Sequence, residues 1–151
     1  RRSSDLRQAA LSGVLAGYQL INVLVELIDG SSHPVDSSQV AFEQAGALAF
    51  RSACERAGLT LLEPIMKVTI TTPDQYLGAI TGDLNARRGM IMGTEDRGTT
   101  CMLHAEVPLA EMFGYTTTLR SLSRGRASST MEPHTYRDLP PNVAKEVLAT
   151  V

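Results

Sequence analysis

After Pro64, the spacing of apolar residues switches twice from the period of a strand to the period of a helix. Met66, Val68 and Ile70 alternate with polar residues, as expected for a strand with one buried face. The next segment repeats apolar residues at helical spacing, at Tyr76, Leu77, Ile80 and Leu84. The succession recurs further along, so the predicted order is β-α-β-β-α-β. This order is typical of the α+β, ferredoxin-like split βαβ fold, whose sheet has one face free for a partner.

Turn and capping residues set the predicted limits of the first helix and of the hairpin after it. Thr72-Pro73-Asp74-Gln75 predicts a capping box with proline at the first helical position, and Gly89 ends that helix. Residues 90–107 predict a hairpin that turns at Glu95-Asp96-Arg97-Gly98, where Gly98 suits a positive φ. One face of its second strand holds Cys101, Leu103, Ala105 and Val107.

A second helix and a fourth strand complete the predicted domain. Pro108 opens the helix and Gly125 ends it, with apolar residues at Leu109, Met112, Phe113 and Leu119. Residues 126–136 predict the fourth strand, and residues 142–151 predict a short terminal helix.

The first 60 residues have a different pattern. Residues 5–12 predict a helix and residues 20–28, rich in Ile, Leu and Val, predict a strand. A convincing amphipathic helix follows, with N-cap candidates at Asp36, Ser37 and Ser38, and it runs to about Ala57 before Gly58. We therefore predict three parts, at residues 1–60, 61–138 and 139–151.

Motifs for catalysis and cofactor binding are missing from the sequence. It contains neither G-x-x-x-x-G-K-[ST] nor G-x-G-x-x-G, so no phosphate-binding loop of either kind is expected. His33, His104 and His134 lack metal-ligand spacing, and Cys101 and His104 fall on opposite faces of a strand. We expect no catalytic, cofactor-binding or metal-binding residue in this chain, and therefore no enzyme.

The remaining composition favours a protein of the cytoplasm. There is no signal peptide, and the most apolar early stretch is broken by polar residues, so no membrane contact is expected. Two cysteines suggest a reducing compartment more than a disulfide framework. A net charge of −2 and a pI near 5.9 mean that any nucleic-acid contact must come from a local patch.

Arginines supply the one such patch. Arg120, Arg124 and Arg126 occur with no acid between them. In a split βαβ fold, the second helix ends at the same edge of the sheet as the hairpin turn, which places Arg97 nearby. The pair Arg87-Arg88 ends the first helix and belongs to the opposite edge. Cations at helix ends also favour the macrodipole and pair with nearby acids, so the arrangement alone does not establish RNA binding.

Several separate strings resemble bacterial-type elongation factor G, in the same order and spacing. They are HPVDSS at 33–38, LLEPIMKV at 61–68, GDLNARRG at 82–89, HAEVPLAEMFGY at 104–115 and LRSLSRGRAS at 119–128. The resemblance covers nearly the whole chain. It implies that residues 61–138 are domain V, ferredoxin-like, and that residues 1–60 are the C-terminal part of domain IV, a partial ribosomal-protein S5-like β-α-β region without its first strands. The chain is then expected to be a fragment that lacks the GTPase domain.

The resemblance also implies a function and partners. The full-length factor promotes GTP-dependent translocation of tRNA and mRNA on the ribosome, with GTP and Mg bound outside this chain. Domain V would contact large-subunit rRNA at the factor-binding centre, with Arg97, Arg120, Arg124, Arg126, Arg87 and Arg88 as candidates. The domain IV tip would reach the tRNA–mRNA duplex at the decoding site through Gly30, Ser31, Ser32 and His33. Apolar surface left by the missing strands would favour self-association of the fragment.

Two alternatives remain open from the sequence. Ser32 stands where the family usually has an aromatic residue, and Pro34 restricts His33 to extended conformations. These departures are compatible with a specialised paralogue that acts in ribosome recycling or ribosome protection. The alternative of another class is a ferredoxin-like small-molecule regulatory module, which would need a ligand loop at a sheet edge, and residues 95–98 are the candidate.

Overall fold

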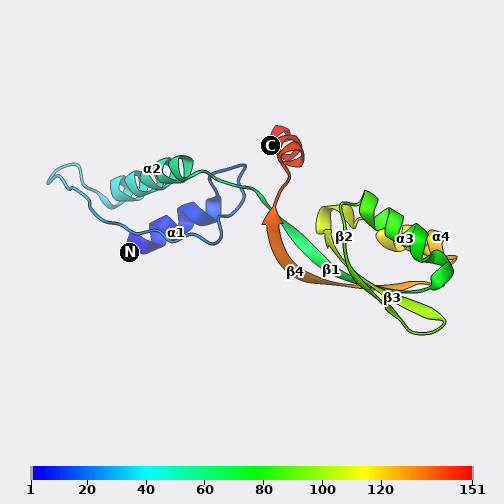
Figure 1. Ribbon diagram of the computed structural model, residues 1–151. Helices are drawn as coiled ribbons and strands as arrows, with labels where there is room; N and C mark the ends of the chain where they lie inside the picture. The colour runs from blue at the N-terminus through cyan, green and yellow to red at the C-terminus, as the bar shows by residue number, and fades with distance from the viewer. Residues whose placement is uncertain (1, 151) are drawn as a thin grey trace. The chain divides into compact units, whose positions relative to one another are not determined.

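The computed structural model describes residues 2–150, which divide into two compact units (Figure 1). One unit runs from Leu61 to Pro140. The other comprises the residues up to Thr60 together with those from Pro141 onward.

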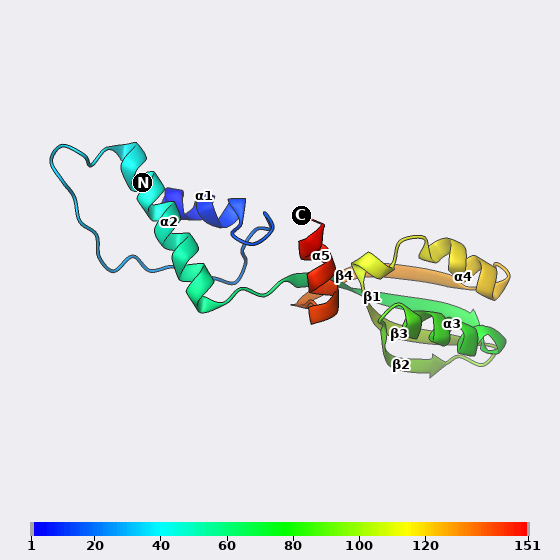
Figure 2. The same cartoon turned by 90° about the horizontal axis from the view of Figure 1, so that it is seen from above.

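The unit from Leu61 to Pro140 is a four-stranded antiparallel sheet with two helices on one face (Figure 2). Its strands stand in the order β2-β3-β1-β4, with the first strand of the chain in an interior position. Their bounds are β1 Leu62–Pro73, β2 Met90–Asp96, β3 Thr100–Pro108 and β4 Ser128–Asp138. Helix α3 (Asp74–Ala86) follows β1, and helix α4 (Tyr115–Ser123) precedes β4. This is the split βαβ order, so the predicted ferredoxin-like α+β fold is confirmed.

The core of this unit lies between the sheet and the two helices. Alternate residues of β1 and β3 face inward, because side chains of a strand point to opposite faces. The predicted inward set on β3, Cys101, Leu103, Ala105 and Val107, is buried as expected. From the helices, Ile80, Leu84 and Leu119 complete the same cluster. Two fully buried isoleucines, Ile70 on β1 and Ile80 on α3, show how closely the helix and sheet pack.

The predicted capping box at Thr72 is wrong. Strand β1 continues to Pro73, and Thr72 pairs in register with Cys101 of β3. Its side chain is therefore buried, and its hydroxyl donates to the carbonyl of Pro73 at 3.2 Å. Helix α3 starts after Pro73 without a side-chain cap. Thr72 therefore belongs to strand β1 and does not cap helix α3.

The predicted second helix is divided into two pieces. A single 3-10 turn, η1 (Leu109–Glu111), follows Pro108, and α4 begins only at Tyr115. Between them Gly114 has φ of 71°, a left-handed conformation that interrupts the helix. The break turns Tyr115 into the core and leaves Phe113 80% exposed, although Phe113 was predicted among the apolar helix positions.

The other unit contains helices α1 (Arg2–Ser12), α2 (Gln39–Ala57) and α5 (Pro141–Ala149). Helix α2 begins as predicted, because the Ser38 hydroxyl accepts a hydrogen bond from the N–H of Ala41 at 3.1 Å. Gly58, with φ of 80°, ends it. Within the described residues, no helix is long and apolar enough to span a membrane.

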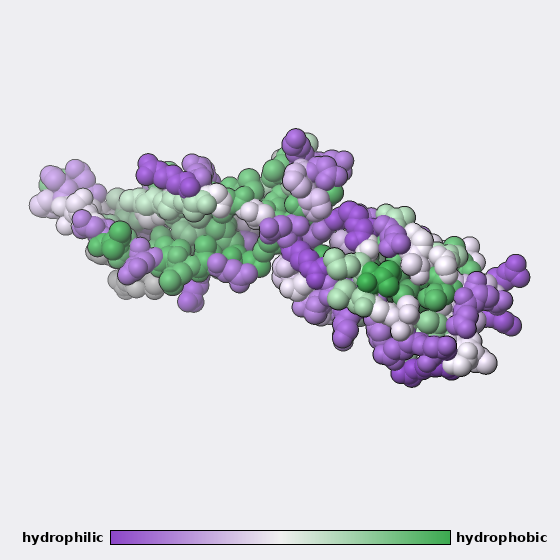
Figure 3. All heavy atoms as spheres, viewed as in Figure 1, coloured by the Kyte–Doolittle hydropathy of each residue, from purple (hydrophilic) through white to green (hydrophobic). Residues whose placement is uncertain are grey.

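The strand predicted at residues 20–28 is wrong, since this stretch is irregular. A strand needs a neighbour to pair with, and the sheet of the described chain lies wholly within the other unit. Without a partner strand, the apolar residues of the segment lie at the surface, and Leu24 is 94% and Ile28 is 91% exposed. The space-filling view shows hydrophobic residues over this part of the molecule (Figure 3).

Candidate nucleic-acid interface

Strand register brings three of the predicted arginines, Arg97, Arg124 and Arg126, to the same end of the strands. The end of β1 lies beside the beginnings of its two neighbours, with Pro73 opposite Thr100 of β3 and Thr71 opposite Ser128 of β4. The hairpin turn that carries Arg97 precedes β3, and the segment that carries Arg124 and Arg126 precedes β4. Both connections therefore lie at the same end of the strands (Figure 2). The opposite end holds the C-terminus of α3.

Residues 120–127 form a tight turn from α4 into β4, which we call the RGR turn after Arg124, Gly125 and Arg126. The N–H of Gly125 donates to the carbonyl of Arg120 at 2.9 Å, and Arg124 has φ of 51°. These are the features of a Schellman helix end, in which the left-handed position is usually glycine. A side chain there costs roughly 1 kcal/mol, and here that position is an arginine.

The arginine side chains of the RGR turn are free of internal partners. Arg120, Arg124 and Arg126 are exposed. Among the residues that the structure describes, none of these three guanidinium groups makes an ion pair or a side-chain hydrogen bond. Three exposed cations with no nearby acid form a positive patch on a chain whose net charge is −2.

Arg97 lies in the hairpin turn and is partly neutralised. Its guanidinium is 3.4 Å from a carboxylate oxygen of Glu95, and the other oxygen of Glu95 lies 3.3 Å from Nε2 of His104. Arg97, and then His104, lower the pKa of the Glu95 carboxyl. On its other side, His104 Nδ1 lies 3.2 Å from the hydroxyl of Thr69. Arg97 is thus the last member of a row of polar contacts that runs through Glu95 and His104 to Thr69.

Arg87 joins the two helices of the sheet-containing unit. It donates to Asp83 at 2.8 Å on α3, to the Glu111 carbonyl at 2.5 Å on η1, and to Thr118 at 3.1 Å on α4. Its guanidinium also stacks over the ring of Tyr115, 5.2 Å from the ring centroid. All of these partners lie within the unit, so Arg87 has a structural role.

Arg88 is held by two carboxylates. Its guanidinium makes a two-pronged contact with Glu63 at 2.7 and 2.9 Å, and it reaches Glu111 at 3.1 Å. The hydrogen bond to Glu63, followed by that to Glu111, raises the pKa of Arg88 despite partial burial. Arg87 and Arg88, which the sequence offers as candidates for rRNA contact, are therefore both paired with acids of their own unit.

His33 begins a small closed turn in the irregular segment of the other unit. Its N–H donates to the Ser37 hydroxyl at 2.5 Å, and the N–H of Ser37 donates back to the His33 carbonyl at 3.2 Å. The imidazole is 67% exposed, with Nδ1 3.5 Å from Asp36. Gly30, Ser31 and Ser32, which precede it, are also exposed. The four residues of the predicted tip are accessible to a partner.

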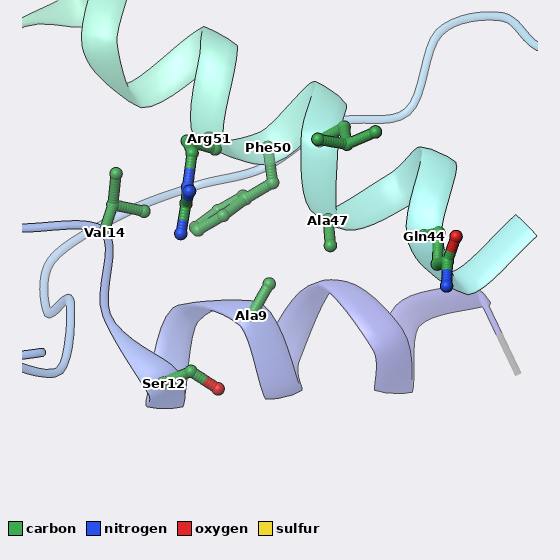
Figure 4. A pocket seen from close by; sticks show the side chains of 8 residues that line it. Ala9, Ser12, Val14, Gln44, Ala47, Phe50 and Arg51 are labelled. Carbon is green, nitrogen blue, oxygen red and sulfur yellow. The ribbon is translucent and has the colours of Figure 1, made fainter.

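Other features of the structure offer little chemistry. Helices α1 and α2 flank a cavity of about 390 Å³ with a mostly apolar lining (Figure 4). Its lining residues are Ala9, Ser12, Val14, Gln44, Ala47, Leu48, Phe50 and Arg51. Burial raises the pKa of the Cys101 thiol, which disfavours the thiolate. No group of side chains in the described residues could hold a metal ion.

One residue of the interface escaped prediction. Ser123 is fully buried at the end of α4, and its hydroxyl contacts the backbone on both sides of the RGR turn. A serine among arginines suggests a solvated surface. Its position four residues after Leu119, however, places it on the buried face of the helix, and that spacing was the available signal.

Comparison with known proteins identifies both parts of the chain. Residues 4–58 match the family described as elongation factor G, domain IV, and residues 60–147 match the elongation factor G C-terminus. Elongation factor G of Aquifex pyrophilus is 50% identical over 143 residues, and that of Chlamydia caviae is 52% identical over 137 residues. These alignments cover 95% and 91% of the chain but 20% of each relative.

A solved structure is similar in fold as well. The chain aligns with a crystal structure of a protein from Thermus thermophilus at a TM-score of 0.88 and 38% identity. The alignment covers 99% of this chain and 23% of that one. The chain therefore belongs to the elongation factor G family, and it spans about a fifth of the length of the curated relatives that it matches.

Proposed function

We propose that this chain is the ribosome-binding C-terminal portion of a translation elongation factor G, which promotes GTP-dependent translocation of tRNA and mRNA. The observation that carries the proposal is the patch of unpaired arginines at the RGR turn, within a segment that matches the family. In this proposal GTP and Mg bind to the full-length factor outside this chain, which holds no cofactor of its own. The factor acts in the cytoplasm.

The chemistry of the patch suits RNA phosphates. Guanidinium groups bind phosphate oxygens through two parallel hydrogen bonds, and such contacts fix the position of a protein on nucleic acid without reading its sequence. Arg124 and Arg126 have no competing carboxylate, whereas Arg97 must share its charge with Glu95. We rank Arg124 and Arg126 first, with Arg120 beside them, and Arg97 next as contacts of large-subunit rRNA. We leave Arg87 and Arg88 out of this proposed role, because internal partners occupy their guanidinium groups.

The exposed turn at residues 30–33 supports a second contact. We propose that it meets the tRNA–mRNA duplex at the decoding site, with His33 as the principal side chain. Imidazole can stack on a base or sugar and can donate one hydrogen bond without carrying a full charge at neutral pH. Closure of the turn through Ser37 holds the backbone of His33 while its ring stays accessible.

Removal of charge from the RGR turn tests the proposal. In the full-length factor, we expect Arg124→Ala with Arg126→Ala to make the plot of log affinity for ribosomes against log salt concentration less steep. The magnitude of its negative slope should fall by about two, because two phosphate contacts are lost. The matched control is Arg51→Ala with Arg56→Ala, which removes the same charge from exposed positions on α2. Unchanged affinity and slope in the first variant would refute the assignment of these arginines.

A specialised paralogue is the second candidate, favoured by the tip sequence. Ser32 and Pro34 depart from the family pattern next to His33. A translocation assay run beside a ribosome-splitting assay, both with the full-length factor, separates the two roles. Fast translocation supports the main proposal, whereas ribosome splitting without translocation supports the paralogue.

A further inference from the structure

Ser123 closes the RGR turn with its side chain. The hydroxyl donates to the carbonyl of Leu119 at 2.7 Å and accepts the N–H of Ala127 at 3.1 Å. Its side chain is fully buried. Because an unpaired buried hydroxyl is costly, the Ser123 side chain depends on these two backbone partners. One buried oxygen therefore joins the last turn of α4 to the residue just before β4.

Between the two ends of this link, the backbone donors of the turn are already used. The N–H of Gly125 donates to the Arg120 carbonyl, and the N–H of Arg126 donates to the Ser123 carbonyl at 3.0 Å. Arg124 makes a longer contact of 3.5 Å to the Ser121 carbonyl. With the Ala127 N–H on Ser123, every backbone donor from 124 to 127 has an acceptor within the turn. An anion at this site must therefore be held by side chains.

The helix end at Arg88 provides an internal comparison. Arg88 also has a positive φ, 58°, and Gly89 donates to the carbonyl of Leu84 at 2.8 Å, so the two helix ends share this hydrogen bond and a left-handed arginine, although Gly125 also has a positive φ and Gly89 does not. At Arg88, two carboxylates hold the side chain and offset the strain. At Arg124 no acid does so among the described residues, and the turn has the Ser123 link instead. A left-handed arginine thus pairs with internal carboxylates at one helix end, whereas at the other its guanidinium has no ion-pair partner among the described residues.

We propose that Ser123 is a positioning residue that fixes the RGR turn so that Arg124 and Arg126 together face RNA phosphates. The inference rests on the proposed function, and it adds the device that orients the two arginines. Ser123 touches no phosphate in this account. By holding the turn in one conformation, it keeps both arginines within reach of their phosphates, which is a form of preorganisation.

Ser123→Ala in the full-length factor tests the inference, with Ser121→Ala as the matched control on the exposed side of the same helix. Affinity for isolated large ribosomal subunits should fall about fivefold with Ser123→Ala, and the salt slope should drop by about one, because one arginine no longer reaches its phosphate. Ser121→Ala should change neither quantity. A folding role alone would lower the folded fraction and leave the salt slope unchanged.

A double-mutant cycle separates this inference from the proposed function. Ser123→Ala should have no further effect on affinity when Arg124 and Arg126 are already alanine. If the double arginine variant binds as the wild type does, the assignment of Arg124 and Arg126 to phosphate contacts fails, and the positioning role fails with it. If that variant binds weakly while Ser123→Ala keeps full affinity and slope, the positioning role alone is overturned. Should Ser123→Ala unfold, Ser123→Thr keeps the hydroxyl, and loss of the salt slope in a folded Ser123→Thr variant would also contradict the proposal.

Discussion

Two arginines have left-handed backbone conformations, but only one of them pairs with an acid inside the domain. Arg88 satisfies Glu63, a carboxylate only 8% exposed, whereas Arg124 has no partner among the described residues. We expect Arg88→Gly to lower the free energy of unfolding by on the order of 3 kcal/mol, because it leaves a buried carboxylate unpaired. Arg124→Gly should change it by less than about 1 kcal/mol, because glycine relieves the positive φ but adds freedom to the unfolded chain.

Urea denaturation of the 151-residue chain measures both changes, followed by a signal from the sheet-containing unit. Equal destabilisation by the two variants would show that Arg124, like Arg88, serves the fold. That result would remove the reason for regarding Arg124 as open to a ligand.

At the scale of elements, one glycine inside helix α3 and one just after it show where helix propensity decides stability and where packing does. Gly82 lies within α3 with open space where a Cβ would stand, while a Cβ on Gly89 would lie 2.6 Å from the Leu84 carbonyl oxygen. Gly82→Ala should raise the free energy of unfolding by up to about 1 kcal/mol through helix propensity. Gly89→Ala should lower it by about 2 kcal/mol, since backbone atoms must move. Thermal unfolding of the two variants, with opposite shifts expected, checks the pair; shifts of the same sign would contradict it.

Sequence periodicity was sufficient for the sheet and its helices but not for three local features. Met66, Val68 and Ile70 are buried as their alternation predicts, because one strand face packs against helices. Thr72 was assigned to a helix cap because local capping chemistry is silent about sheet pairing. Gly114 was not recognised as a break because apolar spacing alone runs through it. Ser123 was missed since residue type outweighed helical position.

The failure at residues 20–28 belongs to the same scale and has another cause. The segment has the composition of a strand, but a strand is defined by its partner, and composition cannot supply one. The candidate site could likewise be predicted only in part from the sequence. The placement of Arg97, Arg124 and Arg126 at one end of the strands came from topology, whereas the acid partners of Arg87 and Arg88 came only from the structure. Only the structure shows which arginines have no ion pair or side-chain hydrogen bond among the described residues.

At the scale of the whole molecule, the irregular segment of residues 13–36 exposes apolar side chains that a stable monomer would bury. We predict that the chain self-associates through this segment, with a concentration dependence visible by sedimentation velocity. Leu24→Lys with Ile28→Lys should suppress the association, because both side chains are more than 90% exposed. Phe113→Lys, at another exposed apolar position, is the control and should leave it unchanged.

Hydrogen exchange gives an independent measure of the same segment. Amides of residues 13–36 that lack regular secondary structure should exchange quickly, while those of β1 and β3 should be protected. Uniformly slow exchange in a dilute monomer would contradict the prediction of self-association through this segment.

The internal satisfaction of the RGR turn has a consequence for how such a surface can change over generations. Its shape is held by backbone hydrogen bonds and one buried hydroxyl, and none of these bonds uses the side chains at positions 124 and 126. The charge carried at these two positions can therefore change without changing the hydrogen bonds that shape the turn. Under the proposed function, exchange of those two side chains would change how strongly the domain binds RNA at a given salt concentration, while the hydrogen bonds that shape the turn stay in place.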